Sequence, residues 1–102
     1  MKYYLISDNI DTYMGMRLAG IEGEVLHTEE EAINALERVL KDDSIGILLL
    51  TEKIEAIVPK QVADIKSSIK TPLAIVLPDR HGTGRTPDSI TKYIREAIGI
   101  KV

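Results

Sequence analysis

The sequence contains no cysteine, and none of its apolar runs approaches the roughly 20 residues that a membrane-spanning helix needs. The first absence excludes disulfides, thiol chemistry and cysteine-based zinc sites. The second predicts a chain with no direct membrane insertion. The opening MKYYLISD also lacks the basic start, apolar stretch and small-residue cleavage site of a signal peptide. We therefore expect a cytoplasmic location.

An excess of positive charge is missing as well. The formal net charge is −3, which gives no basis for binding nucleic acid. The charge is unevenly distributed, because residues 1–51 carry 4 positive and 10 negative side chains, whereas residues 52–102 carry 9 positive and 6 negative ones. Such asymmetry is typical of two faces that meet different protein surfaces, and equally of ordinary solvated helices.

The 102 residues are too few for two hydrophobic cores, so we expect a single domain spanning residues 1–102. Four short runs rich in branched and aromatic residues predict strands. The third run has no polar alternation, which is typical of a central strand covered on both faces. The prolines that bracket the fourth run favour a sheet edge. The four runs are Lys2–Ser7, Gly23–His27, Ser44–Thr51 and LAIVL at 73–77.

Helical spacing of apolar residues fills the segments between these strands. Asp11 predicts the cap of a weak first helix, whose buried side would carry Met14, Leu18 and Ile21. Thr28 and Glu31 predict a capping box at the start of a second helix, because their side chains can each accept a backbone N–H. The apolar row of this second helix is Ile33, Leu36, Val39 and Leu40.

Further helical segments follow the third and fourth strands. After the third strand an apolar row predicts one helical face, but Pro59 removes a backbone donor inside it, so we expect a kink or two short helices. This row is Ile54, Val58, Val62, Ile65 and Ile69. A last helix is predicted from Thr86-Pro87-Asp88 to near Gly99. Its buried side would carry Ile90, Tyr93, Ile94, Ala97 and Ile98.

The order β-α-β-α-β-α-β-α, with no internal repeat, predicts an α/β fold. We expect a four-stranded, mostly parallel sheet with helices on both faces, a receiver-like (Rossmann-like) three-layer sandwich. In such a sheet the carboxyl ends of the strands share one edge, where ligands bind. The residues expected along this edge are Asp8, Asn9, Thr51, Glu52 and the loop 79–85.

The loop after the fourth strand, within LPDRHGTGRTPDSI, has the glycines of a phosphate cradle. It fits neither common pattern: Asp79 stands where a P-loop has its first glycine, and Pro87 where the dinucleotide pattern has its third. We therefore expect no nucleotide. The glycines are better explained by a tight exit from the strand that leaves Arg80, His81 and Arg85 exposed to a partner or to solvent.

The residues that other active sites on this order of strands and helices need are also missing from the sequence. A receiver domain carries its phosphorylated aspartate at the end of the third strand, where this chain has Leu50, Thr51 and Glu52. Asp8 alone could supply one magnesium ligand, but the needed cluster of carboxylates is missing. The only histidines, His27 and His81, have no triad spacing. We expect no catalytic residues, no metal and no cofactor.

Three ordered segments carry a family resemblance. They are the opening KYYLISDNIDTYMGMRLAGIEG, the central IGILLLTEKI and, most specific, IKTPLAIVLPDRHGTG at 69–84. With a last helix that ends EAIG, they resemble the F subunit of the V-type (also called A-type) ATP synthase and ATPase of archaea and some bacteria. The resemblance runs the whole length of the chain.

The resemblance implies a non-catalytic rotor subunit of the central stalk. Such a rotor part docks on the long coiled coil of the D subunit. Through that coiled coil it connects to the catalytic A and B subunits and to the membrane ring that moves protons or sodium ions. It helps couple ATP synthesis or hydrolysis to ion transport, and it lies on the cytoplasmic side, peripheral to the membrane.

A part that turns with the stalk must stay attached under torque, so its interface should approach the ~1,600 Å² of a stable complex. The residues predicted to contact the partner are Arg80, His81, Arg85, Tyr93 and Arg95. Tyr93 could equally belong to the core and Arg95 to the plain surface. The alternative function is a free-standing, receiver-like signalling domain that binds a small anion or a phosphorylated partner through Asp8, Arg80 and Arg85.

Overall fold

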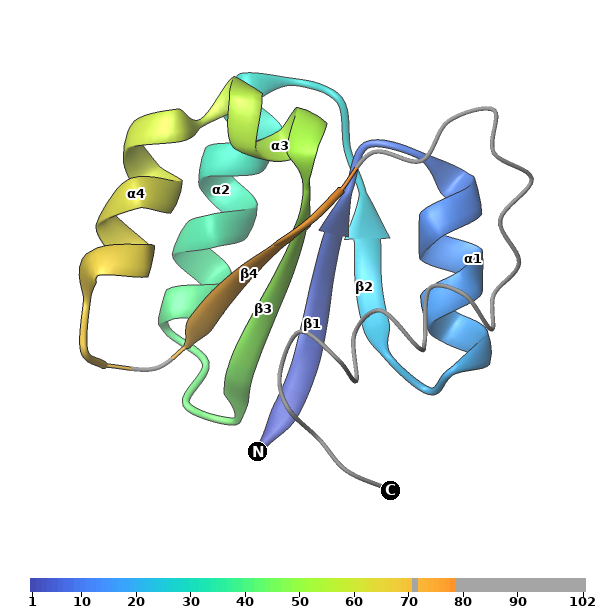
Figure 1. The fold of residues 1–102 in the computed structure, drawn as a ribbon, viewed down its shortest axis with the longest axis horizontal. Coiled ribbons are helices and arrows are strands. Elements are labelled where there is room, and N and C mark those ends of the chain that lie inside the picture. The colour runs from blue at the N-terminus through green and yellow to red at the C-terminus, as the bar shows by residue number, and fades with distance from the viewer. Residues whose placement is uncertain (71, 79–102) are drawn as a thin grey trace.

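A computed structural model describes residues 1–70 and 72–78 of the chain (Figure 1). Strands and helices alternate, apart from two consecutive helices before the last strand. The strands are β1 (Lys2–Ser7), β2 (Glu22–Val25), β3 (Ile45–Thr51) and β4 (Leu73–Leu77). The helices are α1 (Ile10–Leu18), α2 (Glu29–Leu40), α3 (Glu52–Ile57) and α4 (Pro59–Ser67). The predicted strands are confirmed, with β2 shifted toward the N-terminus by one or two residues.

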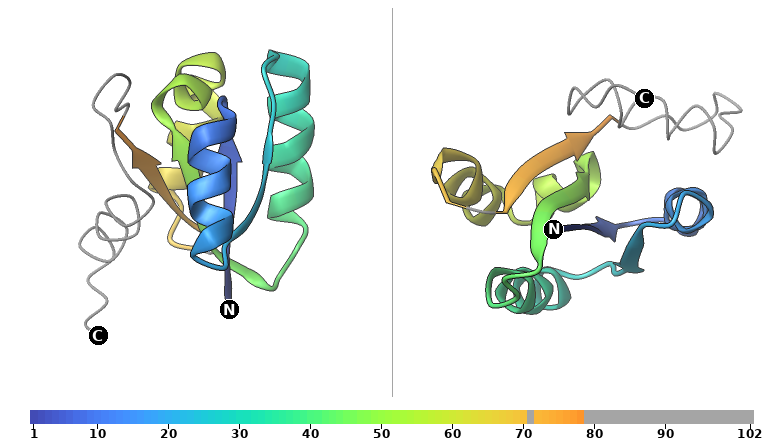
Figure 2. Two further views of the ribbon diagram at one scale, coloured as in Figure 1. Left: turned by 90° about the vertical axis from the view of Figure 1, so that its right-hand side faces the viewer. Right: turned by 90° about the horizontal axis from the view of Figure 1, so that it is seen from below.

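The four strands form one sheet in the order β2-β1-β3-β4, and every neighbouring pair is parallel. Helix α1 covers one face of the sheet, and α2, α3 and α4 cover the other (Figure 2). The predicted α/β fold class is therefore confirmed. The predicted last helix, 86–99, lies outside the described residues.

Strands β1 and β3 occupy the middle of the sheet and are the most deeply buried part of the chain. Leu48, Leu49 and Leu50 are completely buried, as are Leu5 and Ile6. Side chains of successive residues point to opposite faces of a strand, so burial of all three leucines requires cover on both faces. The lack of alternation in IGILLLT has this cause. Strand β4 lies at an edge, as its flanking prolines predicted.

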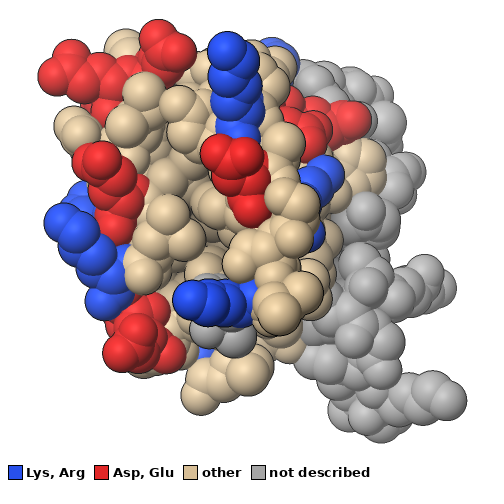
Figure 3. All heavy atoms as spheres, turned by 90° about the vertical axis from the view of Figure 1, so that its left-hand side faces the viewer, with Lys and Arg blue, Asp and Glu red and all other residues tan. Residues whose placement is uncertain are grey.

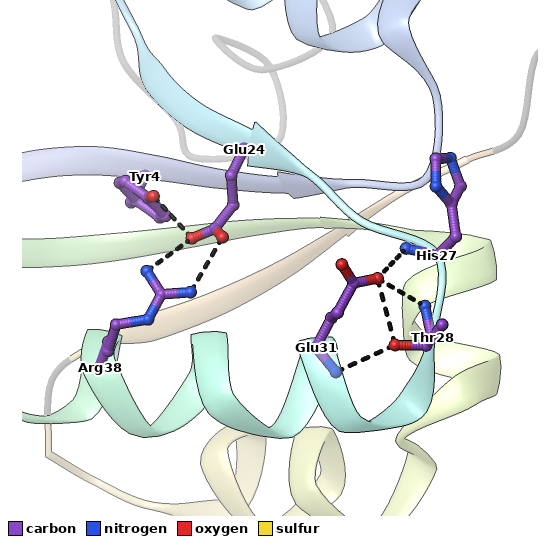
Figure 4. Close-up of polar contacts among 6 residues, drawn as sticks. All are labelled: Tyr4, Glu24, His27, Thr28, Glu31 and Arg38. Atoms are coloured by element: carbon purple, nitrogen blue, oxygen red, sulfur yellow. Dashed lines mark hydrogen bonds and ion pairs between the residues drawn. The ribbon is translucent and has the colours of Figure 1, made fainter.

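Helix α2 starts with the predicted capping box (Figure 4). The Glu31 N–H donates to Thr28 Oγ1 at 3.1 Å, and the Thr28 N–H donates to Glu31 Oε1 at 3.2 Å. The N–H of His27 donates to the same carboxylate oxygen at 3.1 Å. The bond from the His27 N–H, followed by those from the Thr28 hydroxyl, at 3.1 Å, and the Thr28 N–H, lowers the pKa of Glu31. The carboxylate is therefore held ionised at the helix end where a negative charge is favourable.

The predicted apolar row of α2 is wrong at its last residue. Leu40 is 51% exposed, and the buried face consists of Ala32, Ala35, Leu36 and Val39. Small alanine side chains let the helix backbone approach the sheet closely along this line, which leaves Leu40 at the side of the contact.

The segment after β3 forms two short helices, one of the two outcomes that Pro59 predicted. Pro59 is the first residue of α4, where a backbone N–H would have no helical partner in any case. The predicted apolar row is confirmed from Ile54 to Ile65 but fails at Ile69. Helix α4 ends at Ser67, so Ile69 lies beyond the helix and is fully exposed.

Helix α1 differs most from its prediction. Asn9, not Asp11, caps it, because Asn9 Oδ1 accepts the Thr12 N–H at 2.8 Å. Ile21 packs against the buried cluster around Met16, but it lies beyond the end of the helix at Leu18 and not on its buried side. Met14 and Leu18, predicted on the buried side, are 53% and 74% exposed. The buried positions of the helix are Gly15 and Met16, so its contact face is rotated away from the row of larger side chains.

The close approach of β2 to β1 at Gly23 generates a prediction. A Cβ atom at Gly23 would lie 2.6 Å from the carbonyl oxygen of Leu5, a backbone atom that cannot move without disturbing the sheet. We expect Gly23→Ala to lower the free energy of unfolding by about 1–3 kcal/mol, measured by urea denaturation.

Gly46→Ala is the matched control for this prediction. The three atoms nearest to its Cβ would all belong to the flexible side chain of Met1, which is 91% exposed. We expect the control to change the stability by no more than about 1 kcal/mol. Equal losses in the two variants would contradict the steric account.

Candidate functional site

The carboxyl edge of the sheet is where this fold would hold a ligand. As predicted, the ends of β1 and β3 meet there: the Asp8 N–H donates to Thr51 Oγ1 at 3.3 Å. Thr51 ends β3 and is only 6% exposed, and Ser7, which ends β1, is completely buried. Two residues with side-chain hydroxyls, Ser7 and Thr51, thus lie buried at this edge.

The polar groups of the edge bond to one another. The Ser7 hydroxyl donates to the carbonyl oxygen of Asn9 at 2.7 Å and accepts the Asn9 N–H at 3.0 Å. The Asn9 side-chain amide donates to Asp8 Oδ1 at 3.2 Å, while its oxygen caps α1. Through these bonds the edge joins the ends of two strands to the start of a helix.

The chemistry available at this edge follows from its residue types. The place where a receiver domain has its phosphorylated aspartate is held by Leu50, Thr51 and Glu52, and the Thr51 hydroxyl accepts the Asp8 N–H. Across residues 1–70 and 72–78, no three histidine, aspartate or glutamate residues are grouped so that they could hold a metal ion. In the described part of the chain, the hydroxyl and amide groups of this edge take part in hydrogen bonds within the protein.

A second polar cluster lies between β1, β2 and α2 (Figure 4). The Tyr4 hydroxyl donates to Glu24 Oε2 at 2.7 Å, and the Arg38 guanidinium donates to both oxygens of that carboxylate at 3.0 and 3.2 Å. Two parallel bonds from arginine fix the geometry of a carboxylate. The cluster therefore fastens the edge strand β2 to helix α2, and we call Tyr4, Glu24 and Arg38 the clamp.

The clamp shifts the ionisation of two of its members. Burial, and then the hydrogen bond to Glu24, raise the pKa of Tyr4 to about 12. The hydrogen bond to Glu24 likewise raises the pKa of Arg38. Sequence reasoning missed this cluster, because Glu24 and Arg38 meet only through the register of β2 on β1 and the placement of α2. The one available signal was a charged residue, Glu24, at an interior position of a short strand.

The surface over α2 and α4 has an open groove of about 410 Å³. Its apolar lining comes from Ile33, Leu36, Leu40 and Ile65, and its polar lining from Glu37, Gln61, Asp64 and Ser68. Figure 3 shows this side of the molecule, with acidic and basic side chains around an uncharged centre. Leu36 and Ile65 are nearly buried, so the exposed apolar surface of the groove comes mainly from Leu40 and the half-buried Ile33.

The outer side of α1 carries three large apolar side chains in one row. Ile10, Met14 and Leu18 are 57%, 53% and 74% exposed. Residues four apart lie on the same side of a helix, one turn above another, so these three form a continuous ridge. We call this set the α1 ridge.

The partner-contact residues predicted from the sequence lie outside the described part of the chain. They are Arg80, His81, Arg85, Tyr93 and Arg95. Of the residues proposed for binding an anion, only Asp8 is described, and one of its carboxylate oxygens accepts a hydrogen bond from the Asn9 amide. Within residues 1–70 and 72–78, no helix has the length and apolar content needed to cross a membrane.

Comparison with known proteins gives a consistent set of matches. A sequence model of the family described as "ATP synthase (F/14-kDa) subunit" matches residues 4–94. The F subunit of the A-type ATP synthase of Pyrococcus furiosus is 31% identical, over 100% of this chain and 98% of its own length. The protein of the same name from Methanocaldococcus jannaschii is 28% identical, over 100% and 99%. That from Methanothermobacter thermautotrophicus is 32% identical, over 90% and 88%.

Two substitutions at the start of α1 test which residue caps the helix. Asn9→Ala removes the acceptor for the Thr12 N–H and should lower the free energy of unfolding by about 1 kcal/mol. Asp11→Ala, two residues on, changes an exposed side chain and should cost only a few tenths of a kcal/mol. Urea denaturation of both variants measures the difference. A larger loss for Asp11→Ala would mean that the helix starts at Asp11.

The half-buried Tyr4 side chain makes stability depend on alkaline pH. Its folded-state pKa of about 12 is higher than the ordinary 10.0, so the neutral phenol is favoured in the folded protein. This stabilisation is complete below pH 10 and is lost as the pH rises toward 12.

Tyr4→Phe should therefore flatten the loss of stability in that range, measured as thermal midpoints at stepped pH. A tyrosinate absorbance titration of the wild type should contain a step with a pKa of about 12, and that step should be absent from the variant. Identical pH profiles for the two proteins would contradict the clamp.

Proposed function

Because the chain belongs to the family described as "ATP synthase (F/14-kDa) subunit", we propose that it is a non-catalytic rotor subunit of an A-type ATP synthase or ATPase. The observation that carries the proposal is the match over the whole chain to relatives of nearly equal length that are named as F subunits of A-type ATP synthases. The described carboxyl edge supports it, because its hydroxyl and amide groups are engaged in internal hydrogen bonds.

In this proposal the chain docks on the coiled coil of the D subunit in the central stalk. The contacts proposed for it are Arg80, His81, Arg85, Tyr93 and Arg95, and they rest on the sequence alone. Arginine suits this role because its planar guanidinium binds carboxylates with two parallel hydrogen bonds. A stalk surface rich in acidic residues would be the matching partner.

Docked on this coiled coil, the chain turns with the stalk and helps couple ATP synthesis or hydrolysis in the A and B subunits to ion movement through the membrane ring. It acts on the cytoplasmic side, peripheral to the membrane. It binds no nucleotide and uses no cofactor. Its contribution is mechanical, through the stability of the stalk to which it is attached.

Mixing the purified chain with the coiled-coil stalk subunit of the same organism tests the proposal. We expect a complex of one chain per stalk subunit, measured by light scattering after gel filtration. Replacing both Arg80 and Arg85 by Glu should weaken binding by about tenfold, or ~1.4 kcal/mol, and by less at high salt. Lys60→Glu on α4 is the control, a charge reversal at an exposed lysine, and should bind like the wild type.

Two results would contradict the proposed function. The first is the absence of any complex with the stalk subunit. The second is chemistry by the isolated chain with magnesium, either turnover of ATP or a covalently held phosphoryl group after treatment with acetyl phosphate. The second result would instead favour the signalling alternative.

A further inference from the structure

The exposed apolar side chains of the described residues are concentrated on α1. Single exposed apolar residues are normal on a protein surface. Here, however, three of the seven large apolar side chains that are exposed form the α1 ridge, on a helix of only nine residues. The other four, Met1, Leu40, Ile69 and Leu73, come from four different segments. The clustering on α1 therefore needs an explanation of its own.

The packing of α1 on the sheet does not supply that explanation. Its inner side is already occupied by Met16, which is completely buried, with Tyr13 packed beside it. A surface helix normally presents charged and polar residues opposite its buried face. On α1 the charged residues are Asp11 in the first turn and Arg17 in the last, and the apolar ridge runs between them.

We propose that the α1 ridge is a docking surface for a helix of another protein. Resting on the proposed function, we assign that helix to the coiled-coil protein of the stalk. A row of side chains spaced four apart is the shape that fits the groove between the rows of a second helix. Met14, at the middle of the ridge, has a flexible, unbranched side chain that adapts to an irregular partner surface.

The charged residues at the two ends of α1 indicate which charges the partner helix should carry. Asp11 lies near one end of the ridge and Arg17 near the other. A helix laid along the ridge would therefore gain from a basic residue near Asp11 and an acidic residue near Arg17. The partner chemistry is an apolar stripe flanked by charges of both signs, which a coiled-coil helix offers.

The size of the ridge argues against a second copy of this chain as the occupant. A helix of nine residues is about 14 Å long, and one of its faces covers far less than the roughly 800 Å² per partner of a stable complex. A dimer formed through α1 alone would be weak. The ridge suits a partner that also contacts the chain elsewhere.

The placement of α1 is consistent with a second contact of this kind. The Asp8 N–H, two residues before α1, bonds to Thr51, and Thr51 pairs in register with Leu77 near the end of the described chain. The start of the ridge and the end of β4, which precedes the proposed contacts Arg80, His81 and Arg85 in the sequence, are thus at the same edge of the sheet. A single long partner can reach both.

Leu18→Glu in the full chain tests the inference, with Leu40→Glu as its matched control. Both leucines are more than half exposed and lie in the last turn of a helix, but α2 is on the opposite face of the sheet. Titration calorimetry against the purified stalk subunit should show affinity at least tenfold weaker for Leu18→Glu and within twofold of wild type for Leu40→Glu. Met14→Glu should weaken binding like Leu18→Glu.

The possible results separate this inference from the proposed function. If the wild type does not bind the stalk subunit, the proposed function fails and the assigned occupant with it. If the wild type binds and the Leu18 and Met14 variants bind equally well, the ridge inference is overturned while the proposed function stands.

Two other results would assign the ridge a different occupant and overturn the inference. A wild-type dimer in light scattering that Leu18→Glu dissociates would mean that a second copy covers the ridge. A thermal midpoint that falls much further for Leu18→Glu than for Leu40→Glu would mean that the chain's own residues, such as 79–102, cover it.

Discussion

The burial of the β1–β3 strand pair on both faces is the constraint from which the rest of the structure follows. Leu48, Leu49 and Leu50 lose all contact with water, which requires helices above and below the sheet. Parallel strands need crossover connections, and these supply the helices. The parallel direction also brings the ends of β1 and β3 to one edge, where Asp8 meets Thr51.

This architecture is familiar from proteins that use the carboxyl edge for chemistry, and in the described part of this edge the polar groups bond to one another. The hydroxyls of Ser7 and Thr51 and the amide of Asn9 are bonded within the edge itself. These hydrogen bonds fix the position of α1 relative to the sheet. Membership of a family of ATP synthase subunits fits that arrangement, since one part of a complex contributes rigid, well-placed surfaces to the others.

Much of the fold could be predicted from the sequence because its signals are local. The uninterrupted IGILLLT run, the Thr28–Glu31 box and Pro59 each act through their immediate neighbours. Predictions failed where tertiary packing decides. The buried side of α1 was assigned from its largest apolar residues, but Gly15 and Met16 make the contact, and Met14 and Leu18 face outward.

In the candidate site, too, some contacts could be predicted from the sequence and others could not. The meeting of Asp8, Asn9 and Thr51 followed from strand order alone, because parallel strands end together. The clamp of Tyr4, Glu24 and Arg38 did not, because it depends on where α2 lies over two paired strands. In the sequence, an exposed row of apolar residues such as the α1 ridge has the same spacing as a buried row. Only the structure shows which of the two it is.

Direct observation of rotation tests the central claim most directly. The chain has no cysteine, so Lys60→Cys on α4, on the opposite face of the sheet from the α1 ridge, would give a single attachment point for a bead. With the catalytic subunits of the assembled complex fixed to a surface, the bead should turn when ATP is added. A bead that stays still, while one attached to the coiled-coil stalk turns, would contradict a rotor role.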